Sequence, residues 1–255
     1  MDGTAGGAKE MNRFFYHTAQ READIVRLQG DDVQHLTRVL RAAVGSQIEL
    51  CDERECCHTA RITEIRQDEV RCVLESPLSS SEPRTKVDLA FGLLKGEKTE
   101  FVLQKAVELG VNSLRPFYSE RTVVRPKQTQ SARQQRWQKI VRAAAAQARR
   151  NRVPEVVQPL QWPDLLSSFT DYDQVVLFWE AEAEQSLAQA LRKCVPGARI
   201  LLLTGPEGGF SEAEVQGAAA AGAEIVTLGP RILRAETAAI TAVALTLYEA
   251  GEMRR

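Results

Sequence analysis

The sequence predicts an α/β protein that carries a small, mostly β domain ahead of it. Residues 11–76 contain short strand-like stretches around one short helical stretch. Residues 77–85, rich in Ser and Pro, have the composition of a linker. In residues 86–255, continuous apolar stretches alternate with helical ones, as expected of a parallel sheet covered by helices on both faces. Residues 1–10, rich in Gly and Ala before a second Met, are expected to be a tag or a dispensable extension.

The elements follow from local patterns, in chain order. In the first domain, strands are expected at residues 12–17, 47–53, 56–67 and 69–76. A helix over residues 31–41 is predicted by the helical spacing of Val33, Leu36, Val39 and Leu40. In the α/β domain, strands are expected at residues 87–94, 174–179, 200–204 and 224–228. Helices are expected there at residues 97–109, 128–150, 186–193, 211–221 and 236–250.

Composition limits the class of protein. With 44% hydrophobic and 26% charged residues in 255, the chain is globular rather than disordered or collagen-like. No apolar run approaches the roughly 18 residues that span a bilayer, and the first residues lack an apolar signal core. Five Cys, an odd number, argue against a disulfide scaffold and favour a reducing cytoplasm.

Charge is unevenly distributed, although the formal net charge is only −1. Residues 1–114 carry a net charge of −4 and residues 153–255 a net charge of −7. Residues 115–152, the basic segment, hold 11 Lys and Arg against the single acid Glu120, a net charge of +10. A solvated helix face is the ordinary explanation of a charged run, but such a face normally intersperses both signs. The basic segment therefore favours a surface that binds a polyanion.

Helical projection separates two faces in the basic segment. One stripe is apolar and consists of Trp137, Ile140, Val141, Ala144 and Ala148. The opposite side is cationic and carries Arg136, Lys139, Arg142, Arg149 and Arg150. We expect the apolar stripe to pack on the core and the cationic side to contact phosphates, which set affinity without specifying sequence.

The positions of His and Cys exclude several kinds of chemistry. All three His lie at or before His58, and only Cys194 lies in the α/β domain. That domain therefore cannot supply a His-containing zinc site or a nucleophile–His–acid triad from its own residues. A metal site in the first domain is suggested by Cys51, Cys56, Cys57, His58 and Cys72. No C-x-x-C pair occurs there, and adjacent strand residues point to opposite faces, so packing is the expected role.

The stretch GLLKGEKT at residues 92–99 superficially resembles a phosphate-binding P-loop. It has three residues between the glycines instead of four, and Glu97 intervenes where it would repel a phosphate, so we reject this interpretation. Lys95, Glu97 and Lys98 are expected instead to start a helix, where they could take a role at the surface.

Two glycine-rich loops near the C-terminus are the strongest functional signal. The first loop, GPEGG at residues 205–209, follows a buried strand and precedes a helix opened by Ser211 as N-cap, with Glu214 three residues on. The second loop, LGPRILR at residues 228–234, leads to a helix that begins around Glu236. Either loop alone could be a tight turn. Together, at the carboxyl ends of parallel strands, they predict a ligand site. Neither matches G-x-G-x-x-G, so a dinucleotide fold is not supported.

On these motifs the chain resembles the RsmE family, SPOUT-class methyltransferases that act on N3 of a uridine in 16S ribosomal RNA. The resemblance covers the chain from Met11 onward and is most specific in TGPEGGFSEAE from Thr204 and LGPRILRAETA from Leu228. One departure is Ala146, where the family usually carries Glu before Gln147. Further matches are Arg13-Phe14-Phe15, His35-Leu36-x-Arg38-Val39-Leu40-Arg41, KGEKTEFVLQKAVELGV from Lys95, Ser119-Glu120-Arg121, RWQKI from Arg136 and RNRVPE from Arg150.

The resemblance implies an architecture and a set of partners. Residues 86–255 would form a SPOUT domain, a parallel sheet with helices on both faces whose chain threads a deep trefoil knot. Residues 11–76 would form a PUA-like β-barrel that binds RNA. The implied cofactor is S-adenosylmethionine (SAM). The implied partners are 16S rRNA or the small ribosomal subunit and a second copy of the chain, with no membrane and no metal.

Roles can be assigned to individual residues on this basis. Methyl transfer from a sulfonium is a direct displacement, but uridine N3 carries a proton that must be removed or its anion stabilised. We expect Arg234 to stabilise charge on the uracil oxygens and Glu236 to be the general base, with Thr237 as an alternative polar contact. Stabilisation of the helix N-terminus is an equally good explanation of Glu236.

Two further groups of residues complete the expected site. Cofactor contacts are expected from Thr204, Gly205, Glu207, Gly208, Gly209, Leu228, Gly229, Ile232 and Leu233. RNA contacts are expected from Arg13, Arg38, Arg41, Arg136, Arg142, Arg149, Arg150 and Arg152. Two alternatives stay open: a SPOUT methyltransferase for another rRNA or tRNA position, and a non-catalytic RNA-binding assembly factor with a relic cofactor site.

Overall fold

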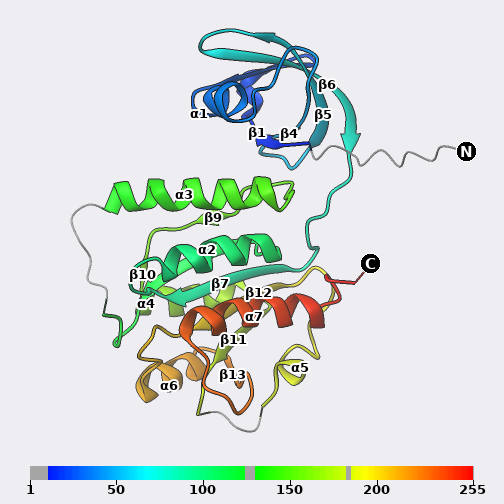
Figure 1. Ribbon diagram of the computed structural model, residues 1–255. Helices are drawn as coiled ribbons and strands as arrows, with labels where there is room; N and C mark the ends of the chain where they lie inside the picture. The colour runs from blue at the N-terminus through cyan, green and yellow to red at the C-terminus, as the bar shows by residue number, and fades with distance from the viewer. Residues whose placement is uncertain (1–10, 124–129, 182–184, 255) are drawn as a thin grey trace, which may run out of the picture. The chain divides into compact units, whose positions relative to one another are not determined.

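The computed structural model describes residues 11–123, 130–181 and 185–254 (Figure 1). The chain divides into two compact units. The N-terminal unit contains the chain up to Ser81 and also Arg149–Val153. The α/β unit contains Glu82–Ala148 and Pro154–Arg255. The return of five residues to the N-terminal unit has no counterpart in the expected domain organisation.

The N-terminal unit is built on a six-stranded sheet with the order β1-β4-β5-β6-β3-β2. β1 and β4 pair in parallel, and the other neighbours are antiparallel. The ladder with β5 carries β6 to Leu78, into the stretch expected to be linker. The strands are β1 (Arg13–Phe15), β2 (Arg21–Glu22), β3 (Ile25–Gln29), β4 (Gln47–Cys51), β5 (Cys57–Ile65) and β6 (Glu69–Leu78).

The helix expected over residues 31–41 is broken into two kinds of turn. α1 (Asp31–Gln34) is followed by a π-helix at His35–Val39, closed by a hydrogen bond from the Leu40 N–H to the His35 carbonyl. The wider turn shifts the side chains out of α-helical register. Val39, expected on the apolar face, is therefore 69% exposed.

Two of the cysteines in the N-terminal unit form a disulfide. Cys51 and Cys57 lie directly opposite each other on β4 and β5, with Cα atoms 4.1 Å apart and their sulfurs bonded. The expectation that these cysteines serve packing alone is therefore wrong for this pair, because the hairpin brings them into direct register. Cys56 is exposed and Cys72 is buried. Within the described residues, no group of three His, Cys, Asp or Glu could hold a metal ion.

The α/β unit is built on a fully parallel sheet of seven strands, ordered β10-β8-β7-β12-β11-β13, with β9 paired to β8. Side chains along β12 and its neighbours are buried, as their continuous apolar sequences predict. The strands are β7 (Lys86–Gly92), β8 (Ser113–Tyr118), β9 (Glu155–Val156), β10 (Leu160–Gln161), β11 (Gln174–Phe178), β12 (Arg199–Thr204) and β13 (Glu224–Val226).

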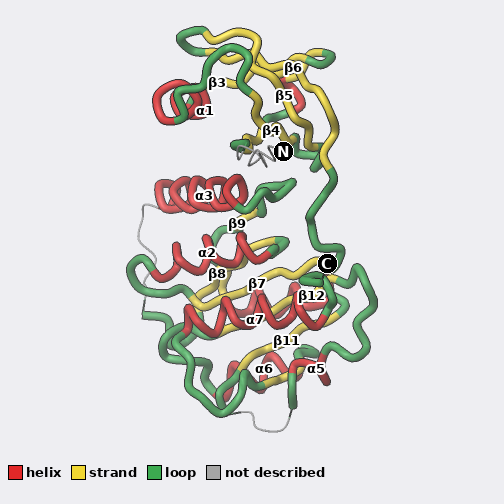
Figure 2. The backbone as a smooth tube through the Cα atoms, turned by 45° about the vertical axis from the view of Figure 1, so that its right-hand side comes forward, coloured by secondary structure: helices red, strands yellow, loops and turns green. Residues whose placement is uncertain are grey.

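Helices cover both faces of this sheet, as predicted (Figure 2). α7 packs on β7 and β12 beside α2, while the other face is covered by apolar side chains of α4 and α6. The helices are α2 (Lys98–Leu109), α3 (Gln130–Gln147), α4 (Trp162–Ser167), α5 (Leu187–Ala190), α6 (Glu212–Ala220) and α7 (Ala235–Glu249). Among the residues described, no helix has both the length and the apolar character needed to cross a membrane.

Candidate active site

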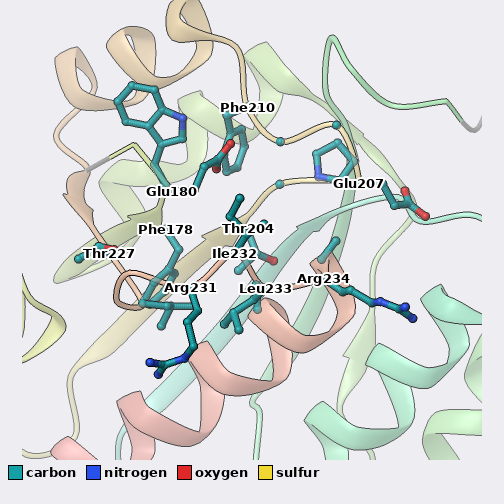
Figure 3. A pocket seen from close by; sticks show the side chains of 18 of the residues that line it. Phe178, Glu180, Thr204, Glu207, Phe210, Thr227, Arg231, Ile232, Leu233 and Arg234 are labelled. Atoms are coloured by element: carbon teal, nitrogen blue, oxygen red, sulfur yellow. The ribbon is translucent and has the colours of Figure 1, made fainter. Parts of the chain in front are cut away.

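The loops that follow β11, β12 and β13 surround one cavity of about 240 Å³ (Figure 3). It lies at the carboxyl ends of the parallel strands, where ligands bind in α/β folds. The structure brings both glycine-rich loops to this cavity, together with Arg234. Every residue expected to contact the cofactor lines it: Thr204, Gly205, Glu207, Gly208, Gly209, Leu228, Gly229, Ile232 and Leu233.

The first loop is folded tightly on itself and on the end of β7. The Gly209 N–H donates to the Pro206 carbonyl at 2.9 Å, and Gly209 adopts a positive φ of 67°. A Cβ added to Gly92, the last residue of β7, would lie 2.5 Å from the Pro206 nitrogen. Glycine is therefore required at Gly92 for the close approach of the loop and at Gly209 for the turn itself.

Behind the first loop, polar contacts attach it to the loop after β8. The helix α6 begins with the capping box expected from the sequence, in which Ser211 and Glu214 exchange hydrogen bonds. The Glu214 carboxylate also accepts a hydrogen bond from the Glu120 N–H at 2.9 Å. Arg121 donates to the Gly208 carbonyl at 3.1 Å. The Ser119-Glu120-Arg121 motif thus supports the back of the first loop.

The second loop forms the opposite wall and leads into α7. Thr227 Oγ1 accepts a hydrogen bond from the Gly229 N–H at 3.1 Å, and Gly229 has a positive φ of 98°. Ile232 is 92% exposed at the rim. Figure 3 shows the Arg231 and Arg234 side chains extending outward from the loop in different directions, while Leu233 lies against the cavity.

Several lining residues were not foreseen, among them Phe178, Glu180, Phe210 and Thr227. Phe178 and Glu180 lie at the end of β11 and just beyond it, and Figure 3 shows the Glu180 carboxylate beside Phe210. A Cβ added to Gly209 would lie 3.0 Å from Glu180 Oε1, which places this carboxylate against the first loop. The rule that ligands bind at the carboxyl ends of strands applies to the stretch QVVLFW at residues 174–179, and it points to Phe178 and to Glu180 directly after that stretch.

The three residues expected to be catalytic lie around the N-terminus of α7. Arg234 is the N-cap residue and lines the cavity, whereas Glu236 and Thr237 lie in the first turn, outside its lining. The Glu236 side chain is 13% exposed, and its Oε2 lies 3.5 Å from the Lys98 ammonium. Within the part of the chain that the structure describes, no side-chain hydrogen bond caps the N-terminus of α7, so the alternative role of Glu236 is reduced to its charge near the helix dipole.

The Lys98 ammonium also reaches the first loop, 3.4 Å from Glu207 Oε1. The same oxygen accepts a hydrogen bond from the Lys95 N–H at 3.1 Å. Burial alone would raise the pKa of the Glu207 carboxyl, but the hydrogen bonds from Lys95 and Lys98 hold it below its ordinary value. The KGEK stretch therefore starts a helix, as predicted, and also contacts both sides of the site.

The basic segment is partly as predicted. Trp137, Val141 and Ala144 are buried on α3, whereas Arg136 is exposed and pairs with Glu100 at 2.6 Å. α3 ends at Gln147, however, so the expectation that Arg149 and Arg150 extend its cationic side is wrong. The chain leaves the helix there, and Arg149 has a positive φ of 54°.

Two predicted RNA contacts are buried within the N-terminal unit. Arg13 Nε lies 2.8 Å from Glu49 Oε2, and Arg13 Nη1 donates to the carbonyls of Arg149 and Arg150. Arg150 is itself 4% exposed. Arg13 therefore fastens the returning segment Arg149–Val153 to β1, and neither side chain is on the surface. Arg38, Arg41 and Arg149 are exposed, Arg142 and Arg152 partly so; Arg152 pairs with Glu55 at 3.3 Å.

Comparison with known families assigns a class to this fold and cavity. A family profile described as "RNA methyltransferase domain" matches residues 80–247, and one described as "RNA methyltransferase PUA domain" matches residues 28–75. The first match covers most of the chain and contains both glycine-rich loops. The α/β unit is therefore an RNA methyltransferase domain.

Individual relatives narrow the class. The Ribosomal RNA small subunit methyltransferase E of Bacillus subtilis is 34% identical over 253 residues, which cover 96% of this chain and 99% of the relative. That of Synechocystis is 32% identical and covers 86% of this chain and 71% of its own length. The crystal structure of the Neisseria gonorrhoeae enzyme bound to SAM has a TM-score of 0.84 and 32% identity, covering 94% of this chain and 98% of that one. This protein belongs to the ribosomal RNA small subunit methyltransferase E family, which confirms the resemblance seen in its motifs.

Proposed function

We propose that the protein methylates N3 of a uridine in 16S rRNA, with SAM as the methyl donor. The observation that carries this proposal is the convergence of both glycine-rich loops on one cavity at the carboxyl ends of the parallel strands. The Neisseria relative, described with SAM bound, supports the choice of cofactor. When bound, SAM would supply an electrophilic methyl group.

The cavity has the composition expected of a site for a nucleoside. Phe178, Leu233 and Phe210 supply apolar surface, and the two loops supply backbone N–H and carbonyl groups. The second loop would hold adenine through its backbone groups. The first loop would line the ribose and methionine side, where glycine lets the ligand approach the backbone closely.

We assign roles on the substrate base to Arg234 and Glu236, which lie at the start of α7. Arg234 lies at the rim of the cavity, from which its guanidinium can stabilise negative charge on the uracil oxygens. Glu236, the second residue of α7, is the carboxylate proposed to accept the N3 proton, with Thr237 as a polar contact. Holding N3 in line with the methyl group can supply about 7 kcal/mol or more of the barrier reduction.

RNA would bind through exposed and partly exposed cations of both units. We assign this contact to Arg38, Arg41, Arg136, Arg142, Arg149 and Arg152, and withdraw Arg13 and Arg150 because they are buried. Contacts with phosphates predict binding that weakens steeply with salt. Access to N3 requires an unpaired or flipped uridine, because that atom pairs within a helix.

Assembly and location complete the proposal. We propose a homodimer, a knotted α/β unit and a cytoplasmic protein acting on 16S rRNA or the small subunit. The dimer is supported by exposed apolar side chains on and beside α7, namely Leu245, Tyr248 and Phe101. Sedimentation of the purified protein tests this: a mass near 57 kDa is expected from two 28.3 kDa chains, and a single 28 kDa species would contradict it.

The test of function is mass spectrometry of nucleosides from small-subunit rRNA of cells with and without this gene. We expect 3-methyluridine to disappear with the gene and to return with the wild-type copy, but not with Arg234→Ala or Glu236→Gln. If the lost nucleoside comes from tRNA or another rRNA position, the first alternative holds. If no nucleoside is lost and the protein binds no SAM, the non-catalytic alternative holds.

A further inference from the structure

Lys98 is the first residue of α2 and lies between two carboxylates that come from different elements. Its Nζ is 3.4 Å from Glu207 in the first loop and 3.5 Å from Glu236 in α7. Lys98 does not line the cavity, so it is outside the set of residues that would touch the cofactor. The Lys98 ammonium therefore links the first loop to the start of α7 from outside the cavity.

The two carboxylates need this cation. Glu236 is 13% exposed, and its buried Oε2 makes no hydrogen bond among the described residues. A buried charge without a hydrogen bond is costly unless an opposite charge lies nearby, and Lys98 supplies one. Glu207 shares the same ammonium, so without Lys98 two like charges would face each other across the gap.

The chain that leads into Lys98 lies against the first loop. The end of β7 is in such close contact with Pro206 that Gly92 has no room for a Cβ. Shortly after the end of β7, the Lys95 N–H donates a hydrogen bond to Glu207 Oε1 in the first loop. The chain just before α2 and the first loop are thus in direct contact, and the Lys98–Glu236 ion pair links α7 to them.

We propose that Lys98 is a positioning residue that aligns the two loops around the cofactor cavity. By holding Glu207 and Glu236 together, it sets the first turn of α7 and therefore the end of the second loop and Arg234. This inference rests on the proposed function for its effect on catalysis. Its effect on SAM affinity does not depend on which nucleotide is methylated.

The experiment measures SAM affinity by calorimetry and single-turnover methyl transfer to undermethylated 16S rRNA at saturating SAM. Lys98→Met removes the charge but keeps most of the length, and Lys98→Arg keeps the charge. Lys105→Met is the matched control, because Lys105 lies on the same helix and pairs with Glu108 of that helix at 2.9 Å. A further comparison uses two proteins without the carboxylates. One is the double variant Glu207→Gln/Glu236→Gln, and the other is the same double variant with Lys98→Met added.

We expect Lys98→Met to weaken SAM binding at least tenfold and to slow methyl transfer at saturating SAM at least tenfold. Lys98→Arg and Lys105→Met should stay within threefold of wild type. In the double variant, which has no carboxylates to neutralise, Lys98→Met should change SAM affinity less than threefold. That loss of effect separates a role through charge from a general loss of structure.

Three outcomes would overturn the proposal. Lys98→Met could bind SAM as wild type does, it could weaken binding equally with and without the carboxylates, or it could leave the saturated rate unchanged. If wild-type protein methylates no uridine but binds SAM, the proposed function fails, and the affinity comparisons still decide the role of Lys98.

Discussion

Gly92→Ala tests the contact that places the first loop against β7. The added Cβ would lie 2.5 Å from both Cδ and the nitrogen of Pro206, whereas ordinary contacts begin at 3.4 Å. The loop or the strand must therefore move by nearly 1 Å. Overpacking of this kind costs about 1–3 kcal/mol. In a chain of this size that corresponds to a fall in Tm of about 2–12 °C.

The same displacement should reach the cofactor cavity, because Pro206 and the adjoining glycines line it. The loop groups that would hold SAM move with Pro206, so we expect SAM affinity to fall at least tenfold, which is about 1.4 kcal/mol. The matched control is Gly217→Ala on α6, where the added Cβ meets only Leu166 at 3.9 Å. This control should raise stability by up to about 1 kcal/mol, because alanine favours a helix interior.

Thermal melting and calorimetry with SAM read out both variants. The steric effect of the added Cβ is refuted if Gly92→Ala melts with the wild type and binds SAM equally well. It is also refuted if Gly217→Ala loses as much stability as Gly92→Ala, because the cost would then come from glycine replacement in general.

Arg13, Glu180, Cys72 and Arg136 offer four further tests by substitution or chemical labelling. Arg13→Met should lower the free energy of unfolding by about 3–5 kcal/mol in urea titrations, because it leaves Glu49 buried and unpaired; a change below 1 kcal/mol would contradict this. Glu180→Gln should weaken SAM binding in calorimetry about tenfold with little change in Tm, because its carboxylate lies in the cavity rather than in the core; unchanged affinity would exclude this contact. Burial raises the pKa of Cys72 to about 12, so at pH 8 it stays a thiol and should resist iodoacetamide, while the exposed Cys56 is alkylated. Peptide mass spectrometry checks this, and equal labelling would contradict it. Arg136→Gln should reduce the slope of log affinity for rRNA against log salt by about 1, and an unchanged slope would remove Arg136 from the interface.

More of the cofactor cavity than of the fold could be predicted from the sequence, because the motifs that form the cavity are short and local. The glycines and prolines of GPEGG and LGPRILR indicate sharp turns and close approach of the backbone within a few residues. GPEGG directly follows β12, and LGPRILR comes shortly after β13. Parallel neighbours then bring those strand ends together, so the loops had to meet at one edge. Ser211 and Glu214 form their capping box for the same reason, since all its partners lie within four residues.

The features that the sequence did not predict depend on contacts between residues far apart in the chain. β8 was missed because SLRPFY mixes Arg and Pro with apolar residues, and only its burial between β7 and β10 makes it a strand. Arg13 was predicted to be a surface cation, but Glu49 and the returning segment Arg149–Val153 enclose it. The link from Lys98 to Glu207 and Glu236 likewise joins residues more than 100 positions apart.

Methyl transfer by the purified protein is the most direct test of uridine methylation in 16S rRNA. The chain is incubated with methyl-labelled SAM and small-subunit RNA that lacks its own methyl groups, and the RNA is digested to nucleosides for mass spectrometry. We expect the label to appear in 3-methyluridine at one position of 16S rRNA and to be lost with Arg234→Ala. Label in any other nucleoside, or in none while SAM is bound, would contradict it.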